Sequence, residues 1–236
     1  MPKTLVVTSY NQGLYEDYAH RFLDTYRGEL DLAIVSEDPL PTLTNTQTLH
    51  MTAHSNFVKQ NSWRTPTSFK QDAVRFCHKP YAIWTAMQHI HSLEYNPYTG
   101  LLWLDADTVF HKPLTEELIQ ERLYTEHTYT YMGRPNYHSE TGVLWFNTEN
   151  KNSRDYVNLV VELYNTNDIY KLDETHDSYV WDWVRTKRKI KARDIGTSER
   201  VPGGHIQARL FGEYWDHLKG KRKQQGYSQE NQYVKR

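Results

Sequence analysis

The chain has 236 residues, enough for one substantial α/β domain with a sizeable core. Charged residues make up 24% of it and the formal net charge is −1, so the overall charge predicts no general attraction to nucleic acids or membranes. The opening run Leu5-Val6-Val7 is too short for a membrane span or a signal-peptide core, and Cys77 is the only cysteine. We therefore expect no membrane partner and a cytosolic protein.

The start of the chain predicts a βαβ unit. Residues 4–9 and 31–36 are β-branched and apolar runs that predict two strands, and the residues between them, up to about Tyr26, follow a helical pattern. A right-handed crossover usually joins such strands in parallel. Residues 38–66 show no sustained period. They predict a long irregular connection, with a flap as one form that it could take.

The rest of the chain continues the alternation of helices and strands. Residues 68–93 are helical by pattern, and Pro80 marks either a kink or the first turn of a second helix. We predict strands at 101–104, 129–133 and 142–147, and helices at 115–123, 154–165 and from 177 to about 184. This order is typical of an α/β fold with a mainly parallel central sheet flanked by helices and partly antiparallel strands added at one side.

The most informative motif is Asp105-Ala106-Asp107, which directly follows the apolar run 101–104. A buried strand of a parallel sheet delivers both carboxylates to its carboxyl end, where ligands of open α/β sheets gather. Hard oxygen ligands suit Mg²⁺ or Mn²⁺, which commonly bridge to nucleotide phosphates. The alternative is a strand-to-loop turn with solvated aspartates, because D-x-D is a short and common pattern.

A second motif lies in the tail. Residues 214–223 combine His217 with a glycine-containing basic turn that includes Lys219, Lys221 and Arg222. Such a cluster is able to complete a metal site and to neutralise a diphosphate. The alternative is a solvated basic tail. Because an upstream D-x-D is present in an α/β chain, we predict that the two motifs are halves of one site.

The order and spacing of several motifs resemble the metal-dependent nucleotide-sugar glycosyltransferases with the GT-A fold, in particular compact phage and bacterial enzymes related to family 8. These motifs are Val7-Thr8-Ser9-Tyr10-Asn11, Phe76-Cys77-His78-Lys79, the segment 102–108, Ser139-Glu140-Thr141-Gly142, His176-Asp177-Ser178, and Asp216-His217-Leu218-Lys219-Gly220 with Arg222-Lys223. The resemblance implies a single GT-A (Rossmann-like) domain over residues 1–236, with 205–236 as a basic tail closing over the donor diphosphate. One departure is the stretch 220–223, where family 8 enzymes usually have a Pro and a Trp.

The resemblance also implies roles for individual residues. Asp105, Asp107 and His217 would bind the metal ion, Mn²⁺ or Mg²⁺, and Asp105 would contact the ribose or the metal. Tyr10 and Asn11 correspond to the nucleobase site. The implied donor-binding residues are Tyr10, Asn11, Arg75, Lys79, Asp105, Ala106, Lys219, Gly220, Lys221 and Arg222. For Arg75 and Lys79 the alternative is a solvated helix face.

Two further carboxylates resemble those that line the donor sugar and the acceptor. If the reaction inverts, Asp177 is the first candidate to position or deprotonate the acceptor hydroxyl, and Glu140 is the second. A retaining course, as in family 8, needs no such base, and the sequence leaves the course open. The alternatives are an N-cap role for Asp177 and a turn role for Glu140 ahead of a strand.

The expected enzyme is a hexosyl- or pentosyltransferase with a UDP-sugar donor. The basic segment 185–193, together with the basic tail, predicts a surface that tracks phosphates, unless it is only a solvated face. Our first hypothesis for the acceptor is a 5-hydroxymethyl pyrimidine in phage-type DNA, extruded from the duplex. The second is a saccharide or lipid-linked glycan. A non-catalytic alternative is a basic nucleic-acid-binding module with an incidental D-x-D.

Overall fold

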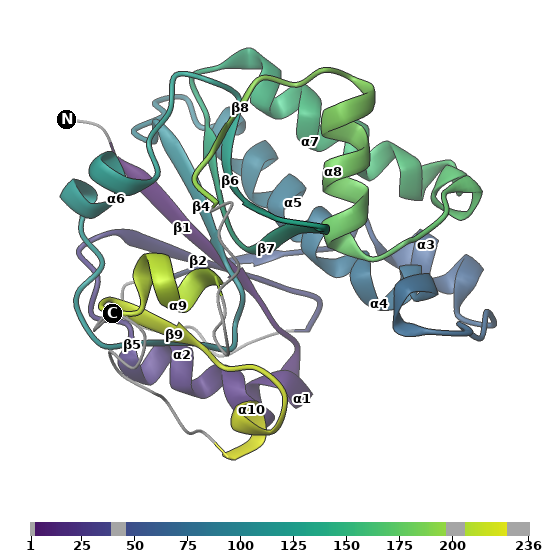
Figure 1. Cartoon of the computed structure of the whole chain (residues 1–236), viewed down its shortest axis with the longest axis horizontal. Coiled ribbons are helices and arrows are strands. Elements are labelled where there is room, and N and C mark those ends of the chain that lie inside the picture. The colour runs from purple at the N-terminus through teal and green to yellow at the C-terminus, as the bar shows by residue number, and fades with distance from the viewer. Residues whose placement is uncertain (1–2, 39–45, 197–205, 226–236) are drawn as a thin grey trace.

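A computed structural model of the chain describes residues 3–38, 46–196 and 206–225. A seven-stranded sheet in the order β3-β2-β1-β4-β7-β6-β8 forms its centre (Figure 1). Only β7 runs antiparallel to its neighbours, and the other strands of this sheet share one direction. The strands are β1 (Thr4–Ser9), β2 (Asp31–Ser36), β3 (Thr46–His50), β4 (Gly100–Leu104), β6 (Tyr129–Arg134), β7 (Tyr137–Asn147) and β8 (Ala192–Asp194). The predicted α/β fold with a mainly parallel sheet is confirmed.

Helices cover both faces of the sheet. One face carries α5 (His78–Ser92), α7 (Lys151–Asn165) and α8 (Asp177–Lys187), and the other carries α2 (His20–Thr25), α6 (Glu116–Arg122) and α9 (Ile206–Phe211) (Figure 1). Alternate residues of a strand enter the two apolar layers, so that Leu5 and Val7 pack with the first group and Val6 with the second. Burial on both faces explains why these strands read as continuous apolar runs.

The remaining elements are short. They are α1 (Gln12–Leu14), a π-helical turn (Tyr15–Ala19), α3 (Ser55–Asn61), α4 (Ala73–Phe76), α10 (Lys221–Gln225), two 3₁₀ turns (Phe69–Gln71 and Asp168–Lys171) and a two-stranded sheet of β5 (Thr108–Phe110) and β9 (Trp215–His217). None of the helices within the described ranges has the length and apolar character needed to cross a membrane.

The prediction of an irregular connection over 38–66 is wrong for the residues that the structure describes. β3 pairs in parallel with β2 at the edge of the sheet, and α3 follows it. The sequence of β3, TQTLH, carries no apolar alternation because its side chains are half-buried or exposed at that edge. Residues 39–45 of this connection lie outside the described residues.

The helical region 68–93 consists of several short elements and one long helix. Asp72 caps α4, because its side chain accepts a hydrogen bond from Arg75 N at 3.1 Å. α5 begins at His78, so Pro80 lies in the first turn of a second helix, where its missing N–H costs nothing. Lys79 lies in the same first turn of α5, and its side chain reaches Asp105 at the end of β4.

Candidate active site

Asp105 and Asp107 lie at the carboxyl end of β4, and the tail of the chain lies against them. β5 pairs antiparallel with β9 so that Thr108 faces His217, and Leu218 N donates to Asp107 O at 2.9 Å. His217 Nε2 is 2.8 Å from Asp107 Oδ1 and 3.6 Å from Asp105 Oδ2. The structure therefore brings together the three residues that the sequence analysis singled out as metal ligands.

The three side chains fit a divalent cation. Asp107 and His217 are 4% and 2% exposed, and Asp107 Oδ1 accepts no hydrogen bond from the described residues even though it faces the imidazole. Two carboxylates and one imidazole form a donor set that Mn²⁺ accepts. Burial raises the pKa of Asp107, but His217 and Lys223 outweigh it and hold this pKa well below its usual value. Asp107 is thus a carboxylate at neutral pH.

Lys79 links the D-x-D motif to the start of α8. Its Nζ lies 2.9 Å from Asp105 Oδ1 and 2.6 Å from Asp177 Oδ2, and it donates to Thr141 O at 3.1 Å. Burial lowers the pKa of Lys79, but Asp105 and Asp177 raise it more, so the net shift is well above its usual value. Burial raises the pKa of Asp177, but Lys79 and Thr141 bring it below its usual value. Lys79 is therefore a buried ammonium and does not belong to a solvated helix face.

The two predicted acceptor-side carboxylates both lie in ordered elements. The N-cap of α8 is His176, and Asp177 is the first helical residue, where its Oδ1 accepts from Ser178 N at 2.9 Å. Glu140 is buried inside β7, which begins at Tyr137, so a turn role ahead of the strand is wrong. Its Oε1 accepts from Gly142 N at 3.0 Å, and its Oε2 lies 3.4 Å from Arg134 Nη1.

Gly142 makes room for the imidazole of His217. A Cβ at this position would lie 2.3 Å from Gln207 Nε2 and 2.7 Å from His217 Cε1. Gln207 lies in α9, and its Nε2 is 2.7 Å from His217 Nδ1. This contact fixes the plane of the imidazole ring. The sequence analysis missed Gln207, because a lone glutamine in a short helix carries no motif.

Two hollows meet at these residues. The Tyr10 hollow, about 400 Å³, is lined by Tyr10, Asn11, Arg75 and Ala106 among others. The His138 hollow, about 620 Å³, is lined by His138, Glu140, Thr141, His176, Lys219 and Gly220 among others. Both hollows share Phe76, Lys79, Asp105, Asp107, Asp177 and Lys223. The D-x-D carboxylates and Lys79 therefore form the boundary between two spaces, each large enough for a small ligand.

The side chains of the tail differ in direction. Lys219 lies at the His138 hollow with Nζ 3.6 Å from Glu140 Oε1, whereas Lys221 is exposed and outside the lining of both hollows. Arg222 also lies outside them, because it donates to Asp216 Oδ2 at 2.5 Å and to His217 O at 3.3 Å. The residues beyond 225 of the predicted basic tail lie outside the described residues.

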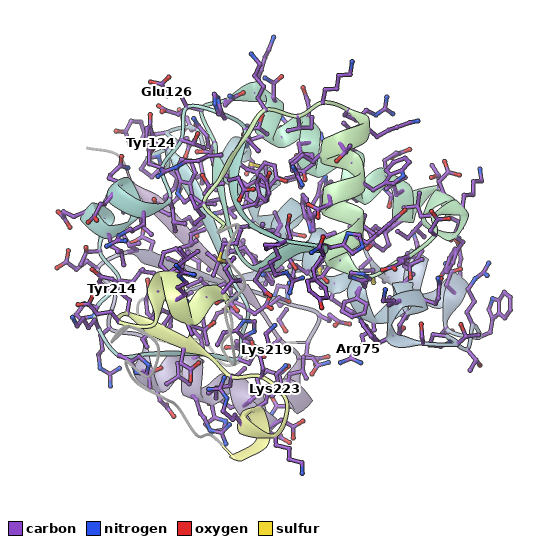
Figure 2. The ribbon with its side chains drawn as sticks, in the orientation of Figure 1. Arg75, Tyr124, Glu126, Tyr214, Lys219 and Lys223 are labelled. Atoms are coloured by element: carbon purple, nitrogen blue, oxygen red, sulfur yellow. The ribbon has the colours of Figure 1, made fainter. Side chains whose placement is uncertain are left out.

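Lys223 was not among the predicted donor-binding residues. Its Nζ lies 2.6 Å from Asp107 Oδ2 and 4.6 Å from the ring centroid of Tyr18. Figure 2 shows Lys219 and Lys223 on the segment from β9 to α10, and both Arg75 and Lys223 line the Tyr10 hollow. The basic composition of the tail indicates that one of its lysines could reach the site, but not which one. The direction of the chain before Lys223 depends on the turn at Gly220, which has a φ of 57°.

The basic segment 185–193 leads away from the D-x-D site: Arg185 lies in α8 and pairs with Asp182 at 2.7 Å, and residues 191–193 lie at the other end of the sheet. β8 runs parallel to β6 with Ala192 beside Tyr129, so Lys191 is at the end of the sheet where β4 begins, not where its carboxylates lie. Arg193 donates to Tyr124 O at 2.5 Å, and Figure 2 shows Tyr124 far from Lys219. The structure thus does not bring this segment to the D-x-D site.

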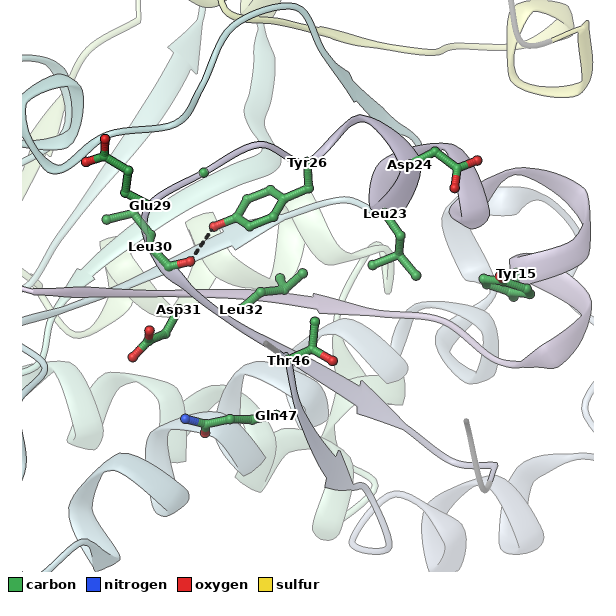
Figure 3. Close-up of a pocket in the computed structure, with 11 residues that line it drawn as sticks. Tyr15, Leu23, Asp24, Tyr26, Glu29, Leu30, Asp31, Leu32, Thr46 and Gln47 are labelled. Carbon is green, nitrogen blue, oxygen red and sulfur yellow. Dashed lines mark hydrogen bonds between the residues drawn. The ribbon is translucent and has the colours of Figure 1, made fainter. Parts of the chain in front are cut away.

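A third hollow, of about 840 Å³, is separate from the site. It is lined by residues 15, 23–32 in part, 46 and 47, none of which lines the other two hollows (Figure 3). Tyr26 Oη donates to Leu30 O at 2.8 Å along its wall. None of its described lining residues belongs to a cluster with metal-ligand spacing.

No protein-family model and no curated protein matches the sequence. Among solved structures, a glycosyltransferase involved in the glycosylation of the major capsid of PBCV-1 aligns over 96% of this chain and 100% of its own, with 12% identity and a TM-score of 0.51. The chain therefore has the GT-A glycosyltransferase fold that its sequence resembles.

Two further glycosyltransferase structures are less similar. GlyE of Streptococcus pneumoniae TIGR4 aligns over 83% of this chain and 45% of its own, with 14% identity and a TM-score of 0.46. The galactosyltransferase LgtC, crystallised with donor and acceptor sugar analogs, aligns over 75% of this chain and 69% of its own, with 10% identity and a TM-score of 0.44.

Proposed function

We propose that this chain is a metal-dependent glycosyltransferase that moves a sugar, a hexose or a pentose, from a UDP-sugar to an acceptor hydroxyl. The observation that carries the proposal is the convergence of Asp105, Asp107 and His217 at the boundary of two hollows. A nucleotide in the Tyr10 hollow would direct its diphosphate at this boundary and its sugar into the His138 hollow. The fold is consistent with this reaction.

In the reaction the bond from the sugar C1 to the diphosphate oxygen breaks, and that oxygen leaves with the electron pair. The acceptor oxygen forms the new bond to C1, and its proton passes to the departing diphosphate oxygen. Asp105, Asp107 and His217 would hold Mn²⁺ or Mg²⁺, which when bound supplies Lewis-acid stabilisation of the diphosphate charge. Lys223 and Lys219 would add positive charge on the same side, since Lys223 already reaches Asp107.

The contacts of Asp177 favour a positioning role over a base role. A general base works best when its pKa lies near the operating pH, and Lys79 keeps the pKa of Asp177 low. Glu140 is likewise held by Gly142 N and by Arg134. We therefore favour a retaining course, in which Asp177 and Lys79 orient the donor sugar and no enzymatic base is needed.

For the acceptor we put a saccharide or lipid-linked glycan ahead of hydroxymethylated DNA. No residue of the basic segment 185–193 lines either hollow, which removes the main support for a phosphate-tracking surface beside the site. In contrast, Phe69 and Tyr137, which are 62% and 75% exposed, line the His138 hollow. Exposed aromatic rings at a hollow mark a ligand-binding surface.

The test is a thermal-shift screen of nucleotide sugars with and without Mn²⁺. A ligand at 100 times its dissociation constant adds about 2.7 kcal/mol to folding stability. We expect a UDP-sugar to raise the melting temperature only when Mn²⁺ is present. A nucleic-acid-binding module would not respond to nucleotide sugars, so a melting temperature that no nucleotide sugar changes, with or without Mn²⁺, would contradict the proposal.

The acceptor is tested separately, with saccharide acceptors and with DNA containing 5-hydroxymethyl pyrimidines. A double variant, Arg188→Ala with Lys189→Ala, serves as a control because both side chains are exposed and lie outside the hollows. If sugar transfers to the modified DNA and the double variant loses that transfer while keeping donor hydrolysis, the DNA acceptor takes first place.

A further inference from the structure

Two more clusters of one glutamate and two histidines lie beside the hollows. They are Glu37 with His54 and His78, and Glu174 with His138 and His176, and in each the ligand atoms lie within 4.8 Å of one another. Imidazole nitrogen and carboxylate oxygen are the ligands of zinc-class cations. The two clusters differ in what faces the second ring nitrogen of a histidine: a carboxylate lies 3.9 Å from His138 Nδ1, whereas His54 Nδ1 has no hydrogen-bond partner among the described residues.

The Glu174 cluster has the geometry of a cation site. His176 Nε2 lies 2.7 Å and His138 Nε2 lies 3.6 Å from the same oxygen, Glu174 Oε2. A tetrahedral zinc ion with bonds of about 2.0–2.1 Å separates its ligand atoms by about 3.3 Å. Small side-chain shifts bring the three atoms to that spacing. The residues come from separate elements, the start of β7, the N-cap of α8 and the connection before it.

Outer contacts orient the ligands of this cluster. The other ring nitrogen of His138, Nδ1, lies 3.9 Å from Asp182 Oδ2, and Asp182 is itself held by Ser139 N at 2.8 Å and Ser139 Oγ at 2.6 Å. Lys70 Nζ holds Glu174 Oε1 at 2.6 Å, which leaves Oε2 directed at the imidazoles. Asp182 lies beyond hydrogen-bond distance of His138 Nδ1, but its carboxylate is on the side of the ring where a supporting carboxylate lies in metal sites.

The Glu37 cluster lacks this support. His54 is 5% exposed and its Nε2 lies 2.9 Å from Glu37 Oε2. Its Nδ1 is buried and has no hydrogen-bond partner among the residues that the structure describes. A cation on Nε2 would leave the ring proton on Nδ1, where a buried N–H without an acceptor is unfavourable. Glu37 is therefore the acceptor of histidine hydrogen bonds and is not part of a metal site.

We propose that His138, Glu174 and His176 bind a second divalent cation, of the zinc class, at the mouth of the His138 hollow. Both histidines line that hollow, and His138 is 38% exposed, so the remaining coordination positions face an open space. These positions suit an oxygen of water or of a ligand in the hollow, as in zinc sites with three protein ligands. The inference concerns metal binding alone and does not rest on the proposed transfer reaction.

The test is equilibrium dialysis of the protein against ZnCl₂, with zinc and protein measured in the retentate. Asp107→Asn removes one ligand of the D-x-D site, so zinc that this variant retains reports on other sites. We expect Asp107→Asn to retain one zinc per chain, and we expect Glu174→Gln or His138→Asn added to it to weaken that binding at least tenfold. Glu37→Gln added to it should leave the binding unchanged.

Melting temperatures show which variants are folded, and two alternative ligand substitutions are included so that one misfolded variant does not decide the outcome. The proposal is overturned if Asp107→Asn retains no zinc. It is also overturned if neither Glu174→Gln nor His138→Asn changes the binding, or if Glu37→Gln is the substitution that removes it. None of these readouts uses a nucleotide sugar, so failure here leaves the proposed transferase activity untouched.

Discussion

His217 Nε2 lies 2.8 Å from Asp107 Oδ1 because β9 pairs with β5 immediately after the D-x-D motif. The pairing makes the tail a structural part of the carboxylate site. A substitution that moves the imidazole of His217 should therefore change metal binding even when both aspartates are intact.

Gly142→Ala is such a substitution. The new Cβ would lie 2.3 Å from Gln207 Nε2 and 2.7 Å from His217 Cε1, so the imidazole has to move. We expect the affinity for Mn²⁺, measured by titration calorimetry, to fall by about tenfold or more, as when support of a ligand is lost. Gly13→Ala is the matched control, because its Cβ would meet nothing closer than 3.6 Å. Equal Mn²⁺ affinities of Gly142→Ala and wild type would count against the role of Gly142.

Lys223→Met should have opposite effects on the affinity for Mn²⁺ and on the affinity for UDP. The ammonium of Lys223 competes with a cation for Asp107 Oδ2, at 2.6 Å, so its removal should raise the affinity for Mn²⁺ alone by about tenfold, the equivalent of one charged hydrogen bond. The affinity for UDP with Mn²⁺ should fall, because the diphosphate loses a cation. Lys221→Met, exposed and outside both hollows, should change neither value. A fall in Mn²⁺ affinity in Lys223→Met would refute the competition.

Lys79→Met should destabilise the fold strongly. It removes the ammonium between Asp105 and Asp177, and the side chains of Lys79 and Asp177 are only 13% and 10% exposed. Breaking a buried ion pair from one side costs about 3–5 kcal/mol of unfolding free energy, measured in urea. Lys112→Met breaks the exposed pair with Glu213 and should cost about 1 kcal/mol or less. Similar losses in both variants would show that Lys79 has no special role in stability.

The stability difference between wild type and Lys79→Met should depend on pH in a defined way. The folded-state pKa of Asp177 is below 3.8, so its stabilisation is present above that value and is lost as the pH falls through the folded-state pKa. The folded-state pKa of Lys79 is above 10.5, so its stabilisation is present below that value and is lost only at higher pH. In the variant, burial without Lys79 raises the pKa of Asp177, so its carboxylate takes up a proton at a higher pH than in wild type. We expect a constant difference from about pH 7 to 9 that shrinks as the pH falls further, and a difference that does not shrink on acidification would contradict the role of the Lys79–Asp177 pair.

The core strands were predictable from sequence because they are buried on both faces. The run 4–9 and the run 31–36 match β1 and β2. β3 was not predictable, since its edge position allows polar residues. β5 and β9 have three residues each and exist only because they pair with one another across the chain, so no local pattern marks them.

The site was predictable only where chemistry follows a local motif. Asp105 and Asp107 end an apolar strand, and His217 lies beside a basic turn, which drew attention to all three. Gln207 and Lys223 gain their roles from tertiary contacts with His217 and Asp107, which no spacing in the sequence encodes. The position of residues 191–193, away from the D-x-D site, likewise follows from the direction of β8 in the sheet.

The most direct test of the account is UDP binding to wild type and to Asp107→Asn, measured by titration calorimetry with and without Mn²⁺. The substitution keeps the shape of Asp107 and removes the charge that faces His217 and Lys223. The account predicts that Mn²⁺ tightens UDP binding to wild type by about tenfold or more, equivalent to about 1.4 kcal/mol, and has no such effect on the folded variant. Equal enhancement by Mn²⁺ in both proteins would contradict a metal site built on Asp105, Asp107 and His217.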